Sequence, residues 1–215
     1  AETAARERLV RMTCRDFAYE TASESPAPGG GSISAYMGAL GAALGTMVAN
    51  LSSHKPGWDD RWKEFSDWAD RGQEVMRSLL ALVDEDTAAF NRIMAALGMP
   101  KGSDEEKKAR ADALEAATLY ATEVPLKTMR ESVRSYELIK AMASEGNPNS
   151  VSDAGVGALA ATAAVRGAHL NVRINAAGLS DREAAERLCA QAQEIEAEAA
   201  AAEAEIMQIV NSKIR

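Results

Sequence analysis

The chain has 215 residues, of which 47% are hydrophobic, 5% aromatic and 26% charged, and its formal net charge is −8. This length suits one domain with a continuous core, and we expect residues 1–215 to form a single helical domain. The ordinary apolar and charged content excludes wholesale disorder. With 24 basic against 32 acidic residues, a nucleic-acid partner is not expected, since that requires a net basic surface.

The two cysteines, Cys14 and Cys189, lie far apart and form no CxxC motif, and neither has a His partner at the spacing of a metal site. We interpret them as reduced thiols, because disulfides are rare in the cytoplasm. The N-terminus alternates in charge and has no apolar segment of the kind found in signal peptides. The sequence therefore predicts a cytoplasmic protein with no bound metal.

Residues 25–53 contain no charged side chain, which is long enough for a membrane-spanning helix. The segment consists mainly of Gly, Ala and Ser, however, and has few of the Leu, Ile and Phe residues that make membrane insertion favourable. We therefore expect a buried helix in a soluble protein, and no membrane contact.

The first half of the chain reads as helices separated by Pro and Gly. A mixed helical pattern over 3–22 ends at Pro26 and Pro28. Ser32 is then expected to be the N-cap of a helix over 32–53. Small residues occupy one face of that helix, which allows another helix to approach closely: Gly38, Gly41, Ala42, Gly45 and Ala49. A long amphipathic helix follows over about 58–97.

The second half continues in the same way. The capping box at 103–106 begins a helix that should reach about Ser144 and be kinked by Pro125. A second helix rich in small residues ends near Gly178, and a last helix follows the polar residues at 180–183. No segment alternates with the period of a β-strand. The expected fold is all-α, an up-and-down bundle of long helices.

Asp86 lies on an apolar helical stripe, where a carboxylate must be paired, solvated in a cleft or given a raised pKa. It either accepts a hydrogen bond from a nearby helix end or faces a ligand. Asp153 lies in the first turn of a helix, where a carboxylate suits the helix dipole. The same position would present Asp153, and the loop amides around Asn147 and Asn149, to a ligand.

Asn171 and Asn175 are four residues apart in a largely apolar helix, where Asn is unfavourable. They indicate either a hydrogen-bond network between helices or a polar ligand. At the front of the 32–53 helix, Gly30, Gly31 and Ser32 form a turn that can hold an anion, although glycine runs also occur in linkers. Beyond its other end, Lys55 either pairs with the helix dipole or meets an anionic substrate.

Several short motifs stand in order along nearly the whole chain: PAPGGGS at 26–32, GAAL at 41–44, ALVDED at 81–86 with AF at 89–90, PKG at 100–102, VPL at 124–126, GN at 146–147, SD at 152–153 and NVRIN at 171–175. Together they resemble the cyclodeaminase/cyclohydrolase family of folate enzymes. Where many relatives have Gly followed by two basic residues, this chain has His54-Lys55-Pro56, and only Lys55 is basic.

The resemblance implies an all-helical homodimer that acts on a tetrahydrofolate derivative, with or without a polyglutamate tail, and needs no metal or nicotinamide cofactor. The implied reaction is cyclisation of 5-formimidoyltetrahydrofolate to 5,10-methenyltetrahydrofolate with release of ammonia, as in histidine degradation. The first alternative is a methenyltetrahydrofolate cyclohydrolase, and the second is a non-catalytic helical interaction protein.

On this basis Asp86 would transfer protons, and Asp153 would bind the pterin or assist a second transfer. Asn171 and Asn175 would orient the ring, and Lys55 would meet the glutamate tail. The two enzyme hypotheses predict that Asp86, Asp153 and one of the asparagines converge, within one chain or across a dimer interface. The interaction-protein hypothesis predicts that the two carboxylates lie apart.

Overall fold

The computed structural model describes residues 8–214, and within them it contains helices and no strand. The all-α prediction is confirmed. The α-helices are α1 (Cys14–Thr21), α2 (Gly30–Ser53), α3 (Trp62–Leu97), α4 (Asp104–Val133), α5 (Ser135–Glu145), α6 (Val151–Ala176) and α7 (Arg182–Lys213). Three short 3-10 turns accompany them: η1 (Leu9–Arg11), η2 (Asp59–Arg61) and η3 (Pro148–Ser150).

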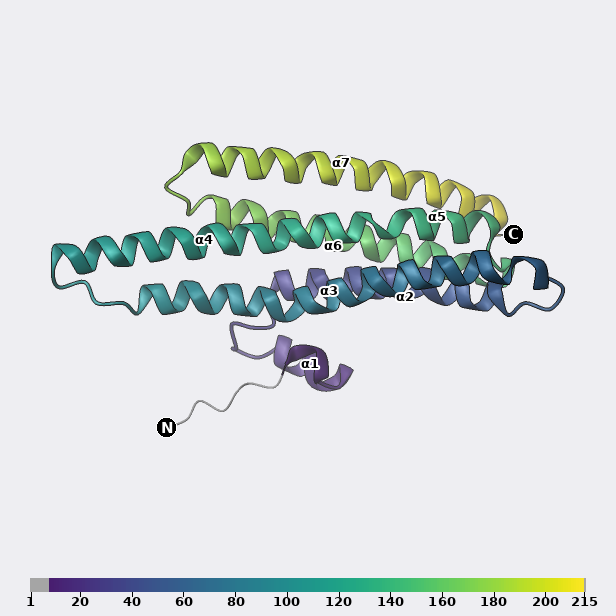
Figure 1. The fold of residues 1–215 in the computed structure, drawn as a ribbon, viewed down its shortest axis with the longest axis horizontal. Coiled ribbons are helices and arrows are strands. Elements are labelled where there is room, and N and C mark those ends of the chain that lie inside the picture. Colours follow the sequence, from purple (N-terminus) through teal and green to yellow (C-terminus); the bar gives the residue numbers. More distant parts are fainter. Residues whose placement is uncertain (1–7, 215) are drawn as a thin grey trace.

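The long helices run up and down along one axis, as Figure 1 shows. Helix α2 packs along both α3 and α6, α4 packs against α3 and α6, and α7 covers α6. The short helix α1 lies at the edge of the bundle beside α2 and α3. Each connection between long helices is short, which is the arrangement expected of antiparallel neighbours.

The small-residue faces predicted on two helices meet each other. A Cβ added at Gly41 of α2 would lie 2.8 Å from the carbonyl oxygen of Gly157 in α6, and one added at Gly157 would lie 3.1 Å from that of Gly41. The two backbones therefore touch at this crossing. Glycine within a helix costs roughly 1 kcal/mol relative to alanine, and the close packing offsets that cost.

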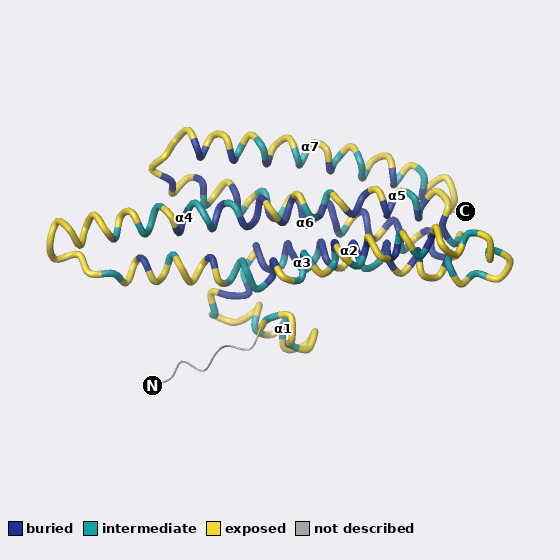
Figure 2. The backbone as a smooth tube through the Cα atoms, in the orientation of Figure 1, coloured by how far each residue is buried: buried dark blue, intermediate teal, exposed yellow. Residues whose placement is uncertain are grey.

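Helix α2 is a core helix. Within residues 8–214 it alone is long and apolar enough to cross a membrane, and 61% of its most apolar window is buried in the bundle. Figure 2 shows dark blue, buried residues along α2, the helix that packs against both α3 and α6. Cys14 and Cys189 are both free thiols, as expected.

Two predictions at the front of the chain are wrong. Helix α1 covers only Cys14–Thr21 of the predicted 3–22, because Thr13 caps it by accepting a hydrogen bond from the amide of Asp16; residues 1–7 lie outside the described part. Ser32 is not an N-cap, since α2 begins one turn earlier after Gly29. The Ser32 side chain is buried against α3 instead.

The predicted helix to Ser144 is divided, and the break is not at Pro125. The capping box at Ser103 and Glu106 is confirmed, but α4 ends at Val133 and α5 begins at Ser135. At the break, the hydroxyl of Ser135 donates to the carbonyl of Ser132 over 2.6 Å, so a side chain supports the backbone there. Pro125 lies inside α4, eight residues before its end.

Candidate functional site

A cavity of about 160 Å³ opens at the start of α2, where this helix meets α3, α4 and α6. Among the described residues that line it, Asp86 is the one with an ionisable side chain. The lining consists of the turn before α2, its first two residues, one stripe of α3, one residue of α4 and two of α6: Pro26, Ala27, Gly29, Gly30, Gly31, Asp86, Thr87, Ala89, Phe90, Ile93, Ala121, Asn171 and Asn175.

Asp86 joins α3 to the first turn of α2. Its Oδ2 accepts a hydrogen bond of 2.8 Å from Oγ of Ser32. Burial raises the pKa of Asp86, and the hydrogen bonds from the side chain and backbone of Ser32 lower it, with burial the larger effect. Of the two interpretations made from the sequence, the hydrogen bond to a helix end is observed, and the role toward a ligand stays a prediction for a residue that lines a cavity.

Gly31 and Gly30 bring the backbone of α2 close to these polar groups. A Cβ at Gly31 would overlap the Asp86 carboxylate, so this position admits no side chain while Asp86 keeps its place. A Cβ at Gly30 would lie 3.3 Å from Nδ2 of Asn171. Gly31 thus admits Asp86 to the first turn of α2, and Gly30 lets the Asn171 side chain approach the same turn.

Asn171 and Asn175 both donate their side-chain amides to backbone carbonyls. Nδ2 of Asn171 lies 2.9 Å from the carbonyl oxygen of Gly167, one turn earlier in α6. Nδ2 of Asn175 lies 2.6 Å from the carbonyl oxygen of Ala121 in α4. The predicted hydrogen-bond network between helices is therefore present at Asn175, and both residues also line the cavity.

Sequence reasoning missed several residues of this cavity. Thr87 lies beside Asp86, and its Oγ1 is 3.4 Å from Oγ of Ser32. Phe90 and Ile93 follow Asp86 on the same stripe of α3 and form the apolar wall, with Phe90 still 36% exposed. The spacing of four and seven residues after Asp86 was a usable signal, since such residues share a helix face.

The remaining predicted residues lie at the other end of α2, where a second cavity of about 660 Å³ includes Lys55 and Asn147. Nζ of Lys55 is 3.9 Å from the centre of the Trp58 ring, a cation–π contact. The backbone amide of Asn147 donates to Oγ of Ser52 over 2.8 Å. His54 also lines this cavity.

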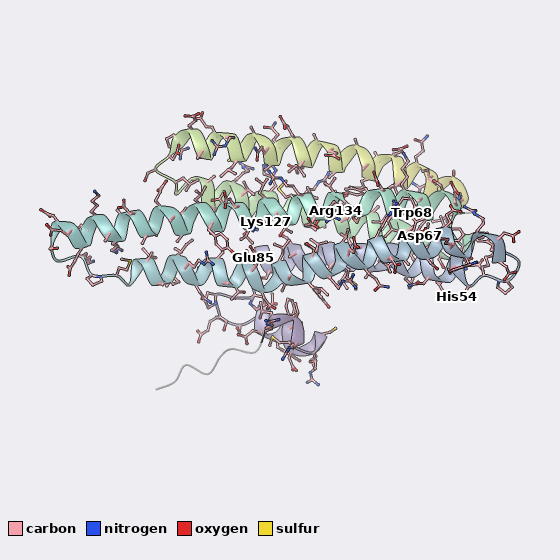
Figure 3. The ribbon with its side chains drawn as sticks, in the orientation of Figure 1. His54, Asp67, Trp68, Glu85, Lys127 and Arg134 are labelled. Atoms are coloured by element: carbon pink, nitrogen blue, oxygen red, sulfur yellow. The ribbon has the colours of Figure 1, made fainter. Side chains whose placement is uncertain are left out.

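The residues around Asp86 and the residues around Lys55 and Asn147 do not meet within one chain. The 24 residues of α2 span roughly 36 Å, with Gly30 at one end and Lys55 just beyond the other. Figure 3 shows this separation, since His54 and Glu85, the neighbour of Asp86, lie far apart along the bundle. Asp153 is in the first turn of α6, roughly 27 Å along that helix from Asn171. Convergence of Asp86 and Asp153 within a single chain is therefore not observed.

A further ionic cluster lies next to Asp86 on α3. Oε1 of Glu85 accepts hydrogen bonds of 2.9 Å from both Nζ of Lys127 and the hydroxyl of Tyr120, and these bonds lower the pKa of Glu85 against the opposing effect of burial. Figure 3 shows Glu85 and Lys127 between α3 and α4. In the part of the chain that the structure describes, no three His, Cys, Asp or Glu side chains are grouped as metal ligands.

With this geometry in place, comparison with known proteins identifies the family. The model of the formiminotransferase-cyclodeaminase family matches residues 13–194, which is most of the chain. The chain belongs to the formiminotransferase-cyclodeaminase family. The resemblance drawn from the short motifs is confirmed.

Two known proteins and one solved structure are similar to this chain. A methenyltetrahydrofolate cyclohydrolase from Methylorubrum extorquens is 39% identical over 94% of this chain and 97% of its own length. A formimidoyltransferase-cyclodeaminase from Gallus gallus is 35% identical over 80% of this chain but only 32% of its own length. The crystal structure of formiminotetrahydrofolate cyclodeaminase from Thermotoga maritima is similar with a TM-score of 0.83 and 26% identity, covering 94% and 97% of the two chains.

Proposed function

We propose that this protein is an enzyme that closes or opens the 5,10-methenyl bridge of tetrahydrofolate, and that Asp86 moves the proton. The observation that carries the proposal is a carboxylate with a raised pKa in a cavity that two asparagine side chains also line. A carboxylate whose pKa is raised by burial is better suited to take and return a proton than an ordinary surface carboxylate. Membership of the family supplies the class of substrate.

Formimidoyltetrahydrofolate cyclodeaminase is the first candidate, because the family description, the solved structure and the Gallus gallus relative carry that activity in their names. N10 of the substrate attacks the carbon of the protonated formimidoyl group at N5. Asp86 takes the proton from N10 and gives it to the formimidoyl nitrogen. The bond from carbon to that nitrogen then breaks, leaving the methenyl cation and ammonia.

Methenyltetrahydrofolate cyclohydrolase is the second candidate and has comparable support. The relative that matches over nearly the full length of both chains, at 39% identity, carries this name. Here water attacks the methenyl carbon and Asp86 takes one of its two protons, which is later released. The remaining hydroxyl proton is transferred to N5 as the bond from the carbon to N5 breaks, which leaves the carbon as a formyl group on N10. The products are 10-formyltetrahydrofolate and a proton.

One pair of assays separates these candidates. Ammonia release from 5-formimidoyltetrahydrofolate identifies a cyclodeaminase, and conversion of 5,10-methenyltetrahydrofolate to the 10-formyl compound above the uncatalysed rate identifies a cyclohydrolase. Absence of both activities would overturn the proposal and leave the non-catalytic interaction protein. The separation of Asp86 from Asp153 within one chain is what that alternative predicts, so the assays are decisive.

We further propose a homodimer formed through α2 and α6. These neighbouring helices carry large apolar side chains that are exposed on a single chain: Leu40, Met47, Leu51, Val156, Leu159, Leu170 and Ile174. Exposed apolar surface on this scale is typical of an interface. Helix α2 has no charged residue, so a second copy can pack against it without burying an unpaired charge.

A twofold axis across the middle of α2 would place the start of α2 in one copy beside the end of α2 in the other. Lys55, Asn147 and Asp153 of one copy would then face the Asp86 cavity of its partner. This arrangement would supply the cation that a folate glutamate tail requires, since the lining of the Asp86 cavity has none among the described residues. We expect this enzyme to work in the cytoplasm without a further cofactor.

A further inference from the structure

Pro125 leaves one backbone carbonyl of α4 without its helical partner. In an α-helix the carbonyl of residue 121 accepts from the amide of residue 125, and proline has no amide hydrogen. The proline ring also crowds the carbonyl one turn before it, which turns that carbonyl away from the helix axis. Pro125 and Ala121 are both buried, so the Ala121 carbonyl needs another hydrogen-bond donor in place of the missing amide.

Asn175 supplies the donor from α6. Its Nδ2 is 2.6 Å from the carbonyl oxygen of Ala121, and a carbonyl oxygen can only accept a hydrogen bond. The NH₂ end of the Asn175 carboxamide is therefore directed to α4. Both Ala121 and Asn175 line the cavity that contains Asp86. The missing hydrogen bond of α4 is thus completed at the wall of the candidate site.

The carboxamide of Asn171 is oriented in a similar way. Nδ2 of Asn171 donates to the carbonyl of Gly167, so its NH₂ end is also directed to backbone. The Oδ1 atoms of both carboxamides, together with the Asp86 carboxylate, stand as acceptors around one cavity. Such a group of acceptor atoms favours a ligand edge that carries several N–H donors. It disfavours an edge that carries only hydrogen-bond acceptors.

We propose that Pro125 is a positioning residue for Asn175. By removing the competing amide of α4, it holds the Asn175 carboxamide with Oδ1 available to a ligand. The cavity would then take the donor-rich edge of its ligand, such as the amino-pyrimidinone edge of a pterin. The identity of this ligand rests on the proposed function, whereas the orientation of Asn175 does not.

The first test measures binding of 5-formyltetrahydrofolate, a one-carbon folate, by titration calorimetry. Pro125→Ala restores the amide, and we expect its Kd to rise about tenfold, the size of one hydrogen bond. Asn175→Ala should weaken binding similarly, and the double variant should be no weaker than Asn175→Ala alone. Binding by Pro125→Ala within twofold of wild type, or additive losses in the double variant, would overturn the proposal.

The control is Thr128→Ala, which removes a hydrogen bond of 3.3 Å from Oγ1 of Thr128 to the carbonyl of Val124 in the same helix. Thr128 is not among the residues that line the cavity. The Kd of this variant should equal that of the wild type. Chemical denaturation should show that Pro125→Ala is at least as stable as the wild type, since alanine is the better helix former. If Pro125 served only the stability of α4, Pro125→Ala would leave the Kd unchanged, whatever its effect on the free energy of unfolding.

A second readout is independent of folate. In the wild type, the side-chain amide hydrogens of Asn175 should exchange slowly with solvent when followed by NMR, and in Pro125→Ala they should exchange faster. Equal exchange in both proteins would overturn the positioning role, whether or not folate binds. If the wild type fails to bind the folate but the exchange rates differ, the proposed function fails and the positioning of Asn175 stands.

Discussion

The hydroxyl of Ser32, in the first turn of α2, donates a 2.8 Å hydrogen bond to Oδ2 of Asp86 on α3. This contact explains why a carboxylate on an apolar stripe is compatible with the fold. It also ties the protonation of Asp86 to the backbone turn at the front of α2, since Ser32 lowers the pKa that burial raises.

Removal of the Ser32 hydroxyl should shift the pH dependence of catalysis. Without this donor the pKa of Asp86 rises further, so that a higher pH is needed to ionise it. We expect Ser32→Ala to move the acidic limb of the kcat/KM profile upward by about half to one pH unit, with most of the rate recovered at alkaline pH. A limb that stays in place, or moves down, would show that this hydrogen bond does not tune the catalytic group.

Ser34→Ala is the matched control for this experiment. Its hydroxyl also lies in the first turns of α2 but donates to the carbonyl of Gly30 over 2.7 Å, within the same helix. Its pH profile should follow that of the wild type. A shift of equal size in this variant would assign the effect to the helix and not to Asp86.

Asp86→Asn should be at least as stable as the wild type at neutral pH. Burial raises the folded-state pKa of Asp86, so the ionised carboxylate costs stability at pH values above its unfolded pKa. Asparagine is neutral and can still accept from Ser32. We expect the gain in the free energy of unfolding to be on the order of 1 kcal/mol at pH 7 and to vanish toward pH 3, below the ordinary Asp pKa. Urea unfolding at both pH values measures it, and a variant less stable at pH 7 contradicts the account.

Gly31→Ala should lose activity even though alanine favours a helix. Its methyl group would overlap the Asp86 carboxylate, which must then move. We expect kcat/KM to fall by about 10²-fold, because a displaced proton-transfer group forfeits general acid–base catalysis. Gly98→Ala is the control, since a Cβ there meets only carbonyl oxygens at 3.5 Å and 3.6 Å, an ordinary contact. Equal effects of the two substitutions would argue against a role for the Gly31–Asp86 approach.

Leu40→Glu should convert the proposed dimer to a monomer. Leu40 is 46% exposed on α2, and a carboxylate there would be buried unpaired if a second copy covers it. Leu97→Glu, at a leucine 44% exposed near the end of α3, should leave the assembly unchanged. Sedimentation equilibrium measures both. A Leu40→Glu protein with the same mass as the wild type would place the interface elsewhere.

Mixed dimers test whether a site draws on both copies. Asp86→Asn and Lys55→Ala should each be nearly inactive alone. If the partner's Lys55 serves each Asp86, an equal mixture refolded together should recover about a quarter of wild-type activity, because half of the dimers hold one intact site. No recovery would mean that the two residues do not belong to different copies of one site.

Long helices with regular apolar spacing were enough to predict an all-α bundle, but local patterns did not predict the start of α2 or the break between α4 and α5. The sequence also identified Asp86, Asn171 and Asn175, since polar residues on apolar helix faces are conspicuous. The role of Ser32 was missed, because an N-cap and a buried donor to another helix look the same before the helices are packed. Pro125 was expected to bend α4, and its relation to Asn175 depends on the position of α6, which local patterns do not contain.

The account is tested most directly by the turnover of Asp86→Asn on the substrate that the wild type accepts, either 5-formimidoyltetrahydrofolate or 5,10-methenyltetrahydrofolate. We expect the wild type to convert one of them, and the variant to be slower by about 10²- to 10⁴-fold while keeping its helix content and assembly. Activity of the variant within a few-fold of the wild type would remove Asp86 from the chemistry and contradict the central claim.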